Sequence, residues 1–245
     1  FSSKDSFFFL STYLPRKMEF LLQVQMHQVP KFWQSEPSPL SIPSKSQREI
    51  LLRNEKSISE FEKVARTIIP QQIPTAYLEG YKKIINTVNK LPWPNTPKAL
   101  FTSNSYWADD LFKIWAAEKT NTKVPLIIGQ HGGHYGMTPF SFNEEHQLKV
   151  ADWWISWGRN HSNHPKILTL GNFKSFGKPW KYNPKGGALM VEMAIPRYSY
   201  HLYAIPIAGQ FLDYLKDQRI FLNLLPDSLR EQILLRLHPL DYGWD

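Results

Sequence analysis

Cysteine is absent from this sequence of 245 residues. The absence excludes disulfide bonds, thiolate zinc sites and cysteine nucleophiles, and it is compatible with a reducing cytoplasm. Long apolar runs are also lacking. A membrane-spanning helix needs ~20 apolar residues, whereas Phe-Phe-Phe-Leu at 7–10 is far shorter and is typical of a buried strand. No Walker loop, Gly-x-Gly-x-x-Gly fingerprint or Gly-x-Ser-x-Gly elbow follows a predicted strand.

The charge of the chain is moderately basic and scattered. Lys and Arg number 29 against 21 Asp and Glu, which gives a net charge of +8. No basic run is long enough for a nucleic-acid-binding arm, so nucleic acid is not an expected partner. The excess fits an anionic substrate or attraction to an acidic membrane surface. Hydrophobic residues make up 42% of the chain, which is enough for a packed core.

The first part of the chain alternates between predicted strands and helices. Short apolar runs predict strands, at 6–10, 98–102, 124–129 and 153–157. Apolar residues at helical spacing predict helices, at 57–69, 77–91, 107–119 and 143–150. Pro70 and Pro74 are expected to end the first of these helices. The alternation is typical of an α/β fold with a parallel sheet.

A second unit of the same kind is expected at the end of the chain. Strands are predicted at 187–193 and 233–237, with helical segments between them. The stretch before them is rich in Asn, Gly, Pro and Lys and contains one short predicted strand, 167–170. We therefore expect an α/β domain, a linker and a second α/β domain, at 1–160, 161–186 and 187–245. Because the sequence lacks an initial methionine and ends just after a strand, we interpret it as a fragment with a truncated second domain that is inactive alone.

The stretch from Ile127 to Gly136 carries the most chemistry. An apolar run ends here in Gly-Gln-His-Gly-Gly-His-Tyr-Gly, so the loop is expected at the carboxyl end of a strand, where ligands bind in open α/β sheets. Glycine permits positive φ and the close approach of a ligand, and histidine exchanges protons near neutral pH. His131 is therefore the candidate catalytic base, while substrate contact and a role in loop structure both stay open for His134.

Two other classes of function remain open. A metal-dependent hydrolase would use His131, His134 and His146, with Asp152 as a further ligand. The sequence contains no His-Glu-x-x-His helix, so no metal is expected. The other alternative is a non-catalytic module that binds glycans or nucleotides.

Five further candidates lie where predicted strands end. Ser103 and Asn104 follow the strand at 98–102, where a helix amino end favours ligand contact. His238 ends the strand at 233–237 and is a candidate hydrogen-bond donor to phosphate, and Arg236 shares its face. Arg197 follows the strand at 187–193, and both a pyrophosphate contact and a plain surface position stay open for it.

Two motifs taken together, Gln130-His131-Gly132 and His238-Pro239, resemble those of GT-B glycosyltransferases. CDP-glycerol glycerophosphotransferases and capsule Kdo transferases, two such relatives, place a histidine-glycine loop and a histidine-proline motif across one cleft. A closer resemblance, over almost the whole chain, is to a transferase family of bacterial surface-carbohydrate gene clusters. The matching stretches are Leu78–Tyr81, Leu100–Ser105, Gly129–Gly136, Ile155–Gly158 and Leu235–Trp244.

The resemblance implies a GT-B-like pair of facing Rossmann-like domains, with the acceptor-side domain first and the donor-binding domain second. It implies transfer of a sugar or polyol-phosphate group in bacterial surface polysaccharide biosynthesis. The donor would be activated by CMP, CDP, UDP or GDP, and the acceptor would be lipid-linked or a glycan. No cofactor is implied. The expected location is the cytoplasm, with peripheral contact with the inner membrane.

The resemblance also implies roles for individual residues. His131 would be the catalytic base or would contact the acceptor phosphate. His238 would contact the donor phosphate or assist the leaving group. The remaining expected site residues bind substrate: Gln130, Gly132, Gly133, His134, Ser103, Asn104, Arg197 and Arg236.

Overall fold

The structure, a computed structural model, forms two compact units, Phe1–Lys178 and Pro179–Asp245, and each is described by itself. It describes residues 6–50, 59–132, 135–136, 139–158, 164–175, 181–198, 208–240 and 242–244. Within these ranges, no helix is both long enough and apolar enough to cross a bilayer.

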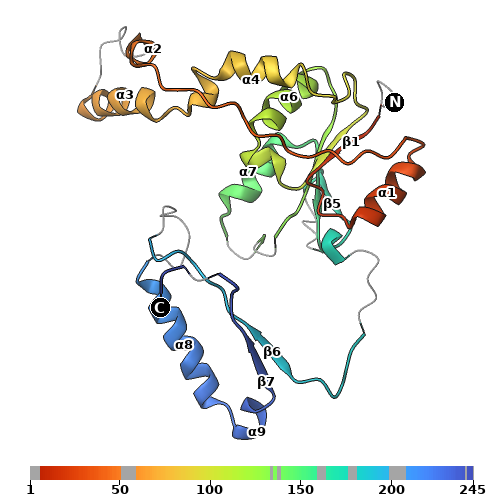
Figure 1. Cartoon of the computed structure of the whole chain (residues 1–245), viewed down its shortest axis with the longest axis vertical. Helices are drawn as coiled ribbons and strands as arrows, with labels where there is room; N and C mark the ends of the chain where they lie inside the picture. The colour runs from red at the N-terminus through yellow and green to blue at the C-terminus, as the bar shows by residue number, and fades with distance from the viewer. Residues whose placement is uncertain are drawn as a thin grey trace. The chain divides into compact units, whose positions relative to one another are not determined.

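The first unit is built on a five-stranded parallel sheet (Figure 1). Its strands are short and mostly buried, and they follow one another across the sheet in chain order. They are β1 (Phe8–Leu10), β2 (Leu100–Thr102), β3 (Leu126–Gly129), β4 (Trp153–Ser156) and β5 (Ile167–Thr169). The α/β class and the parallel sheet expected from the sequence are therefore confirmed, and the arrangement is Rossmann-like.

The helices of this unit divide unequally between the two faces of the sheet (Figure 1). Parallel strands are joined by right-handed crossovers, and strands that step in one direction place these crossovers on one face. Helices α4, α6 and α7 lie on this first face, whereas α1 lies on the second. Their bounds are α1 (Arg16–Gln25), α4 (Tyr81–Val88), α6 (Asp110–Asn121) and α7 (Phe142–Val150).

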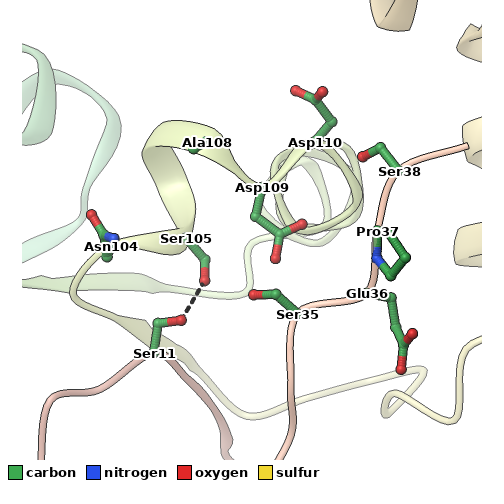
Figure 2. A pocket seen from close by; sticks show the side chains of 10 residues that line it. All are labelled: Ser11, Ser35, Glu36, Pro37, Ser38, Asn104, Ser105, Ala108, Asp109 and Asp110. Carbon is green, nitrogen blue, oxygen red and sulfur yellow. Dashed lines mark hydrogen bonds between the residues drawn. The ribbon is translucent and has the colours of Figure 1, made fainter. Parts of the chain in front are cut away.

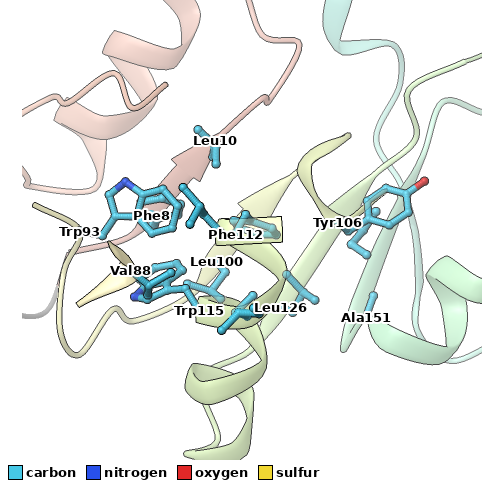
Figure 3. Close-up of a cluster of buried hydrophobic side chains, with 14 of the residues drawn as sticks. Phe8, Leu10, Val88, Trp93, Leu100, Tyr106, Phe112, Trp115, Leu126 and Ala151 are labelled. Carbon is cyan, nitrogen blue, oxygen red and sulfur yellow. The ribbon is translucent and has the colours of Figure 1, made fainter. Parts of the chain in front are cut away.

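The first face holds the main hydrophobic core (Figure 3). Phe8, Leu100 and Phe112 are 0% exposed. The Phe8 ring lies 5.1 Å from the Trp93 ring and 4.5 Å from the Trp115 ring, measured between centroids. Aromatic contacts of this kind add to the free energy gained by burial. The core therefore joins α4 and α6 firmly to the sheet.

The second face carries a smaller cluster of buried aromatic and aliphatic side chains. Phe9, Phe101 and Ile155 point to this side, and Phe173 of the short helix η2 (Phe173–Ser175) packs on them. The α1 residues that pack against this cluster are only half-buried. A mainly apolar cavity of about 640 Å³ lies between α1, the sheet and η2. The second face is therefore less completely covered than the first.

Further helices connect β1 with β2 and β2 with β3. Helices α2 (Lys45–Ile50), α3 (Glu60–Gln72) and η1 (Thr75–Tyr77) precede α4. The predicted helix at 107–119 is two helices, α5 (Ser105–Ala108) and α6. Asp109 separates them, because its backbone is extended and its carboxylate accepts a hydrogen bond from the Phe112 N–H, at 2.9 Å.

The expectation that Pro70 ends its helix is wrong, because α3 continues past it. The last carbonyls of a helix have no helical N–H partner, and the Arg48 guanidinium donates to two carbonyls of this last turn, those of Pro70 and Ile73, at 2.8 and 3.0 Å. The helix ends at Ile73, which is extended. Ile73 precedes Pro74, and the helical conformation is disfavoured for a residue that precedes a proline.

The motif stretch at 78–81 has a structural role in this region. The Glu79 carboxylate accepts hydrogen bonds from Arg48 Nε at 2.7 Å and from the Ser44 N–H at 2.7 Å. The Arg48 guanidinium lowers the pKa of Glu79 to about 2. A side chain at Gly80 would meet Ser41 Oγ at 2.9 Å and a backbone oxygen at 3.0 Å. These contacts join α2, α3 and the turn before α4.

The second unit contains a parallel pair of strands with helices between them. Strand β6 (Ala188–Val191) pairs with β7 (Ile233–Arg236), so both carboxyl ends lie at the same edge. The connection holds α8 (Gln210–Leu224) and α9 (Asp227–Arg230). This β-α-β arrangement confirms the predicted strands and the helical segments between them.

Candidate active site

The glycine-histidine loop begins at the carboxyl end of β3, as predicted. Gly129 is the last residue of the strand. A Cβ atom at this position would lie 2.7 Å from Ser103 Oγ and 2.8 Å from the Phe173 ring. Glycine is therefore required for packing at Gly129, and the polar residues that follow lie at the edge of the sheet where the strands end.

Gln130 fixes the first turn of the loop from inside. Its side chain is 6% exposed. Its Nε2 donates to the Gly132 carbonyl at 2.7 Å, and its Oε1 accepts from the Trp157 N–H at 2.9 Å. The loop after β3 is thereby attached to the end of β4. This is a positioning role, and the predicted substrate contact of Gln130 stays a prediction.

The His131 ring is held by a chain of buried hydrogen bonds that sequence reasoning missed. The Tyr135 hydroxyl lies 2.8 Å from His131 Nδ1. Gln147 Nε2 donates to the Tyr135 hydroxyl, and Trp154 Nε1 donates to Gln147 Oε1 at 2.8 Å. Gln147 and Trp154 are 0% exposed, and Tyr135 is 6% exposed. The partly exposed His131 is therefore anchored to the core of the first face.

The direction of this chain is fixed as far as the Tyr135 hydroxyl. The indole nitrogen of Trp154 can only donate, so the Gln147 amide must direct its oxygen to Trp154 and its NH2 group to Tyr135. The last bond joins the Tyr135 hydroxyl and His131 Nδ1, and its direction depends on the tautomer of the ring.

Burial affects both tyrosines of this network in the same direction. Desolvation raises the pKa of Tyr135, against the hydrogen bonds from Gln147 and Tyr106. Desolvation also raises the pKa of Tyr106 well above its ordinary range. Both hydroxyls therefore keep their protons at neutral pH, and Tyr135 takes part in the network as a neutral hydroxyl rather than as a charged group.

Helix α7 places Gln147 under the loop. Ser141 caps the helix by accepting from the Glu144 N–H, at 3.4 Å. The Glu144 carboxylate accepts from the Gly136 N–H, at 3.0 Å. Gly136 has a φ of 71°, a conformation that favours glycine. The loop, its supporting helix and the histidine are therefore one connected structure.

A second feature of the same sheet edge is a pocket of about 380 Å³ after β1 and β2 (Figure 2). Asn104 lines this pocket, together with Ser105, whose hydroxyl donates to Ser11 Oγ at 3.0 Å. Asp109 and Glu36 add carboxylates to the lining. Carboxylates accept hydrogen bonds from the hydroxyl groups of a ligand, and hydroxyls both donate to them and accept from them. The pocket therefore fits a hydroxyl-rich ligand better than an anion.

Ser103 lies next to this pocket but is turned inward. Its side chain is 0% exposed, and its hydroxyl donates to the Thr12 carbonyl at 3.0 Å. This bond joins the ends of β1 and β2. Of the two candidates after β2, Asn104 therefore reaches the pocket, whereas Ser103 supports its wall; substrate contact stays a prediction for both.

The metal-site alternative is not tested, because one of its three histidines, His134, lies outside the described residues. Among the residues that the structure describes, no group of three potential ligands among His, Cys, Asp and Glu is found. The Asp152 carboxylate accepts from the Leu126 N–H at 2.8 Å, which fixes the start of β4 to β3. Two of the predicted loop residues, Gly133 and His134, lie outside the described residues.

In the second unit, His238 lies just after β7 and is exposed. Its Nδ1 lies 3.2 Å from the Leu240 backbone nitrogen and 3.4 Å from the Leu240 carbonyl oxygen, so the ring is held by the turn that follows β7. The His238 ring lies 5.5 Å from the Tyr242 ring, and the Arg197 N–H donates to the Tyr242 carbonyl at 3.1 Å. His238 and Arg197 are therefore brought to one end of the strand pair.

The side chains of the two arginine candidates differ. Arg197 donates to the Gly243 carbonyl at 3.2 Å and lies over the Trp244 ring. The side chain of Arg236 is exposed at the end of β7. The predicted pairing of His131 with His238 across one cleft joins the two units and stays a prediction.

Fold and site together define an α/β protein with a histidine held at the carboxyl edge of a Rossmann-like parallel sheet. A family model described as LIC12162 family transferase matches residues 1–245, the whole chain. The chain therefore belongs to this family, and it is of the transferase class. No curated protein and no solved structure matches it.

Proposed function

We propose that this transferase moves a sugar or polyol-phosphate group from a nucleotide-activated donor to an acceptor in bacterial surface polysaccharide biosynthesis. The observation that carries the proposal is the buried chain of hydrogen bonds that holds His131 at the carboxyl edge of the sheet. Buried polar networks cost free energy unless every member is satisfied. A network that ends on a partly exposed histidine therefore supports a role for that histidine in chemistry.

In the proposed reaction, a hydroxyl of the acceptor attacks the activated carbon or phosphorus of the donor, and the nucleotide phosphate leaves. His131 serves this step as the base or as a contact to the acceptor phosphate. If the Tyr135 hydroxyl donates to Nδ1, the neutral ring presents Nε2–H to an anionic oxygen of the acceptor. If Nδ1–H donates to Tyr135, the Nε2 lone pair takes the proton of the acceptor hydroxyl.

The other proposed residues act around this step. His238 and Arg197 stabilise the departing nucleotide phosphate through charge-assisted hydrogen bonds. The pocket beside Asn104, with its hydroxyl and carboxylate lining, supports a hydroxyl-rich substrate such as a sugar or a polyol. The net charge of +8 supports an anionic donor.

The test begins with the donor and then turns to the histidine. A thermal-shift screen of the full-length protein against CMP, CDP, UDP and GDP derivatives identifies the donor, because a ligand that binds the folded state raises Tm. Transfer by His131→Ala is then compared with wild type. We expect a loss of roughly 100-fold or more, typical of a group that acts on a proton or a charge in the transition state. Transfer at a near wild-type rate would show that His131 has no such role.

A matched control separates chemistry from folding. His146 is a second histidine of the first unit, and its ring lies 6.2 Å from the Tyr106 ring. His146→Ala is expected to retain most of the transfer activity, since the tyrosine-glutamine chain does not include it. Equal losses in both variants would indicate a general disturbance of the loop.

A further inference from the structure

The cavity on the second face of the sheet is unusual in how its outer wall is attached. Helix α1 forms this wall with Leu21, Leu22 and Met26, and Phe101 and Ile155 of the sheet lie opposite. A hydrophobic core normally closes such a space, because empty apolar volume costs free energy. Here the cavity of about 640 Å³ persists, in the size range of about 300–1,000 Å³ that ligand sites occupy.

Helix α1 is held in place by polar contacts at its ends and on one side. The buried Glu19 carboxylate accepts from Thr12 Oγ1 at 2.7 Å. Gln28, just after the helix, pairs its amide with both the N–H and the carbonyl of Phe7 on the edge strand, at 2.8 and 3.1 Å. Gln23, 1% exposed, donates to the Lys31 carbonyl at 2.9 Å. The helix is therefore fixed without filling the space beneath it.

The lining of the cavity selects the ligand class. Among the described lining residues, only Gln25 has a polar side chain, and none is acidic. Hydrogen bonds to a polar ligand are therefore scarce, and the favourable contribution comes from burial of apolar area, about 0.8 kcal/mol for each CH2 group. A flexible hydrocarbon chain fits this requirement.

One cation, Lys174, follows a residue that lines the cavity and contacts the tyrosine that lies beside His131. Leu14 and Phe173 line the cavity, and their sequence neighbours are Tyr13 and Lys174. The Lys174 ammonium lies 4.5 Å from the centroid of the Tyr13 ring, and the Tyr13 ring lies 6.4 Å from the His131 ring. An anionic group placed beside Lys174 is therefore close to the residue that the proposed function assigns to the acceptor.

Basic residues in the first turn of α1 also favour an anionic ligand. Arg16 and Lys17 are exposed at the start of the helix, which is its end nearest the carboxyl edge of β1. The outward side of the same helix carries Phe20 and Val24, each 46% exposed. Basic residues beside exposed apolar ones are the pattern of a surface that meets anionic lipid.

We infer that the cavity between α1 and the sheet binds the hydrocarbon chain of an anionic amphiphile, whose charged group lies beside Lys174 and Tyr13. The inference rests on the proposed function and names the acceptor class: an anionic group carried on a hydrocarbon chain. The chain is buried under the second face, and the anionic group reaches the edge where His131 lies.

The test measures binding of dodecyl phosphate, below its micelle concentration, to the 245-residue protein by titration calorimetry. Dodecyl maltoside, with the same chain and an uncharged head group, is the comparison ligand. We expect saturable binding of one dodecyl phosphate and weaker binding of dodecyl maltoside. Leu21→Trp fills part of the cavity from a position 41% exposed, where a larger side chain is tolerated. It is expected to raise the Kd of both ligands by about tenfold, the effect of displacing roughly two CH2 groups.

Two further variants make the result specific. Lys174→Gln is expected to raise the Kd of dodecyl phosphate by about threefold to tenfold, the range of a partly exposed charge contact. The Kd of dodecyl maltoside should stay unchanged. Phe61→Trp is the matched control, on α3, at a residue 82% exposed and remote from the cavity lining. It should bind both ligands as wild type does. Absence of saturable binding, or equal binding by wild type and Leu21→Trp, would overturn the inference.

Competition distinguishes two sources of the chain. Displacement by farnesyl phosphate assigns the site to a lipid-linked phosphate, and displacement by phosphatidylglycerol vesicles assigns it to a bulk phospholipid. The binding assay contains no donor and measures no transfer. Its failure therefore overturns the cavity inference alone, while the His131→Ala comparison tests the proposed function alone.

Discussion

The two faces of the five-stranded sheet are built in different ways. On the first face, α4 and α6 bury large side chains, and the closest aromatic rings lie 4.5 Å apart. On the second face, α1 is attached by polar contacts and leaves a cavity of about 640 Å³. The strands follow chain order, so α4, α6 and α7 of their crossovers share one face, while α1, which precedes α4 in the β1–β2 connection, lies on the other. The difference teaches that a sheet wound in one direction stabilises itself on one side and leaves the other available for binding.

The largest expected effect comes from removing matched leucines from helices on the two faces. Leu111 of α6 is 0% exposed in the first-face core, whereas Leu22 of α1 is half-buried beside the cavity. Leu111→Ala should lower the free energy of unfolding by about 3 kcal/mol or more, because it creates a new cavity. Leu22→Ala should cost only about 1 kcal/mol, since it enlarges an existing space. Urea denaturation measures both, and equal losses would contradict the comparison.

A smaller effect is expected from the polar network that passes through the first face. Gln147→Leu leaves Trp154 Nε1 and the Tyr135 hydroxyl without their buried partner. The expected loss is about 2–3 kcal/mol of unfolding free energy. Gln232→Leu is the matched control: Gln232 is exposed and donates to the Ser228 carbonyl. This control should stay within about 0.5 kcal/mol of wild type. A similar value for both variants would show that the network adds no stability.

Tyr135→Phe is expected to change the His131 ring more than the stability of the fold. The variant removes the hydroxyl that is hydrogen-bonded to Nδ1, so the populations of the two tautomers of the neutral ring should change. Stability should fall by about 1 kcal/mol. Long-range ¹H–¹⁵N correlation spectra of the histidine rings distinguish the tautomers. Equal tautomer populations in wild type and variant would contradict the prediction.

The smallest expected effect concerns the polar attachment of α1. Burial raises the pKa of Glu19, against the hydrogen bond from Thr12. The folded state therefore holds this proton more tightly than the unfolded state, and the ionised carboxylate lowers stability as pH rises through the raised pKa. Glu19→Gln keeps an acceptor for Thr12 and should stabilise the protein by less than about 1 kcal/mol at pH 7. This gain in unfolding free energy should vanish near pH 3, where Glu19 is protonated in both the folded and the unfolded state. Unfolding curves measured at pH 7 and pH 3 check the prediction.

Much of the fold could be predicted from local patterns, and the exceptions have physical causes. Helix α1 was not predicted, because its apolar residues lie on two sides. Leu21 and Leu22 line the cavity, whereas Phe20 and Val24 point outward, and Glu19 and Gln23 are buried. No single apolar stripe therefore marks it as an amphipathic helix. The helix break expected at Pro70 failed in a region where a distant residue, Arg48, donates to the carbonyls of the last turn.

The candidate site was predictable in part. The glycines and the histidine after an apolar run were enough to place His131 at the end of a strand. Tyr135 belonged to the recognised motif, but nothing local assigned it a role. Its partners Gln147 and Trp154 lie on a separate helix and strand, and no spacing rule joins them. Only folding brings these residues into contact.

The sequence by itself determined the α/β class, the parallel strands of the first unit and the loop that carries His131. These depend on residue periodicity and on glycine conformations, which act over a few neighbouring residues. The tertiary structure alone decided the strand order, the unequal cover of the two faces and the hydrogen-bonded chain that anchors His131. Each of these depends on contacts between residues far apart in the chain, whose free energies appear only when the sheet is assembled.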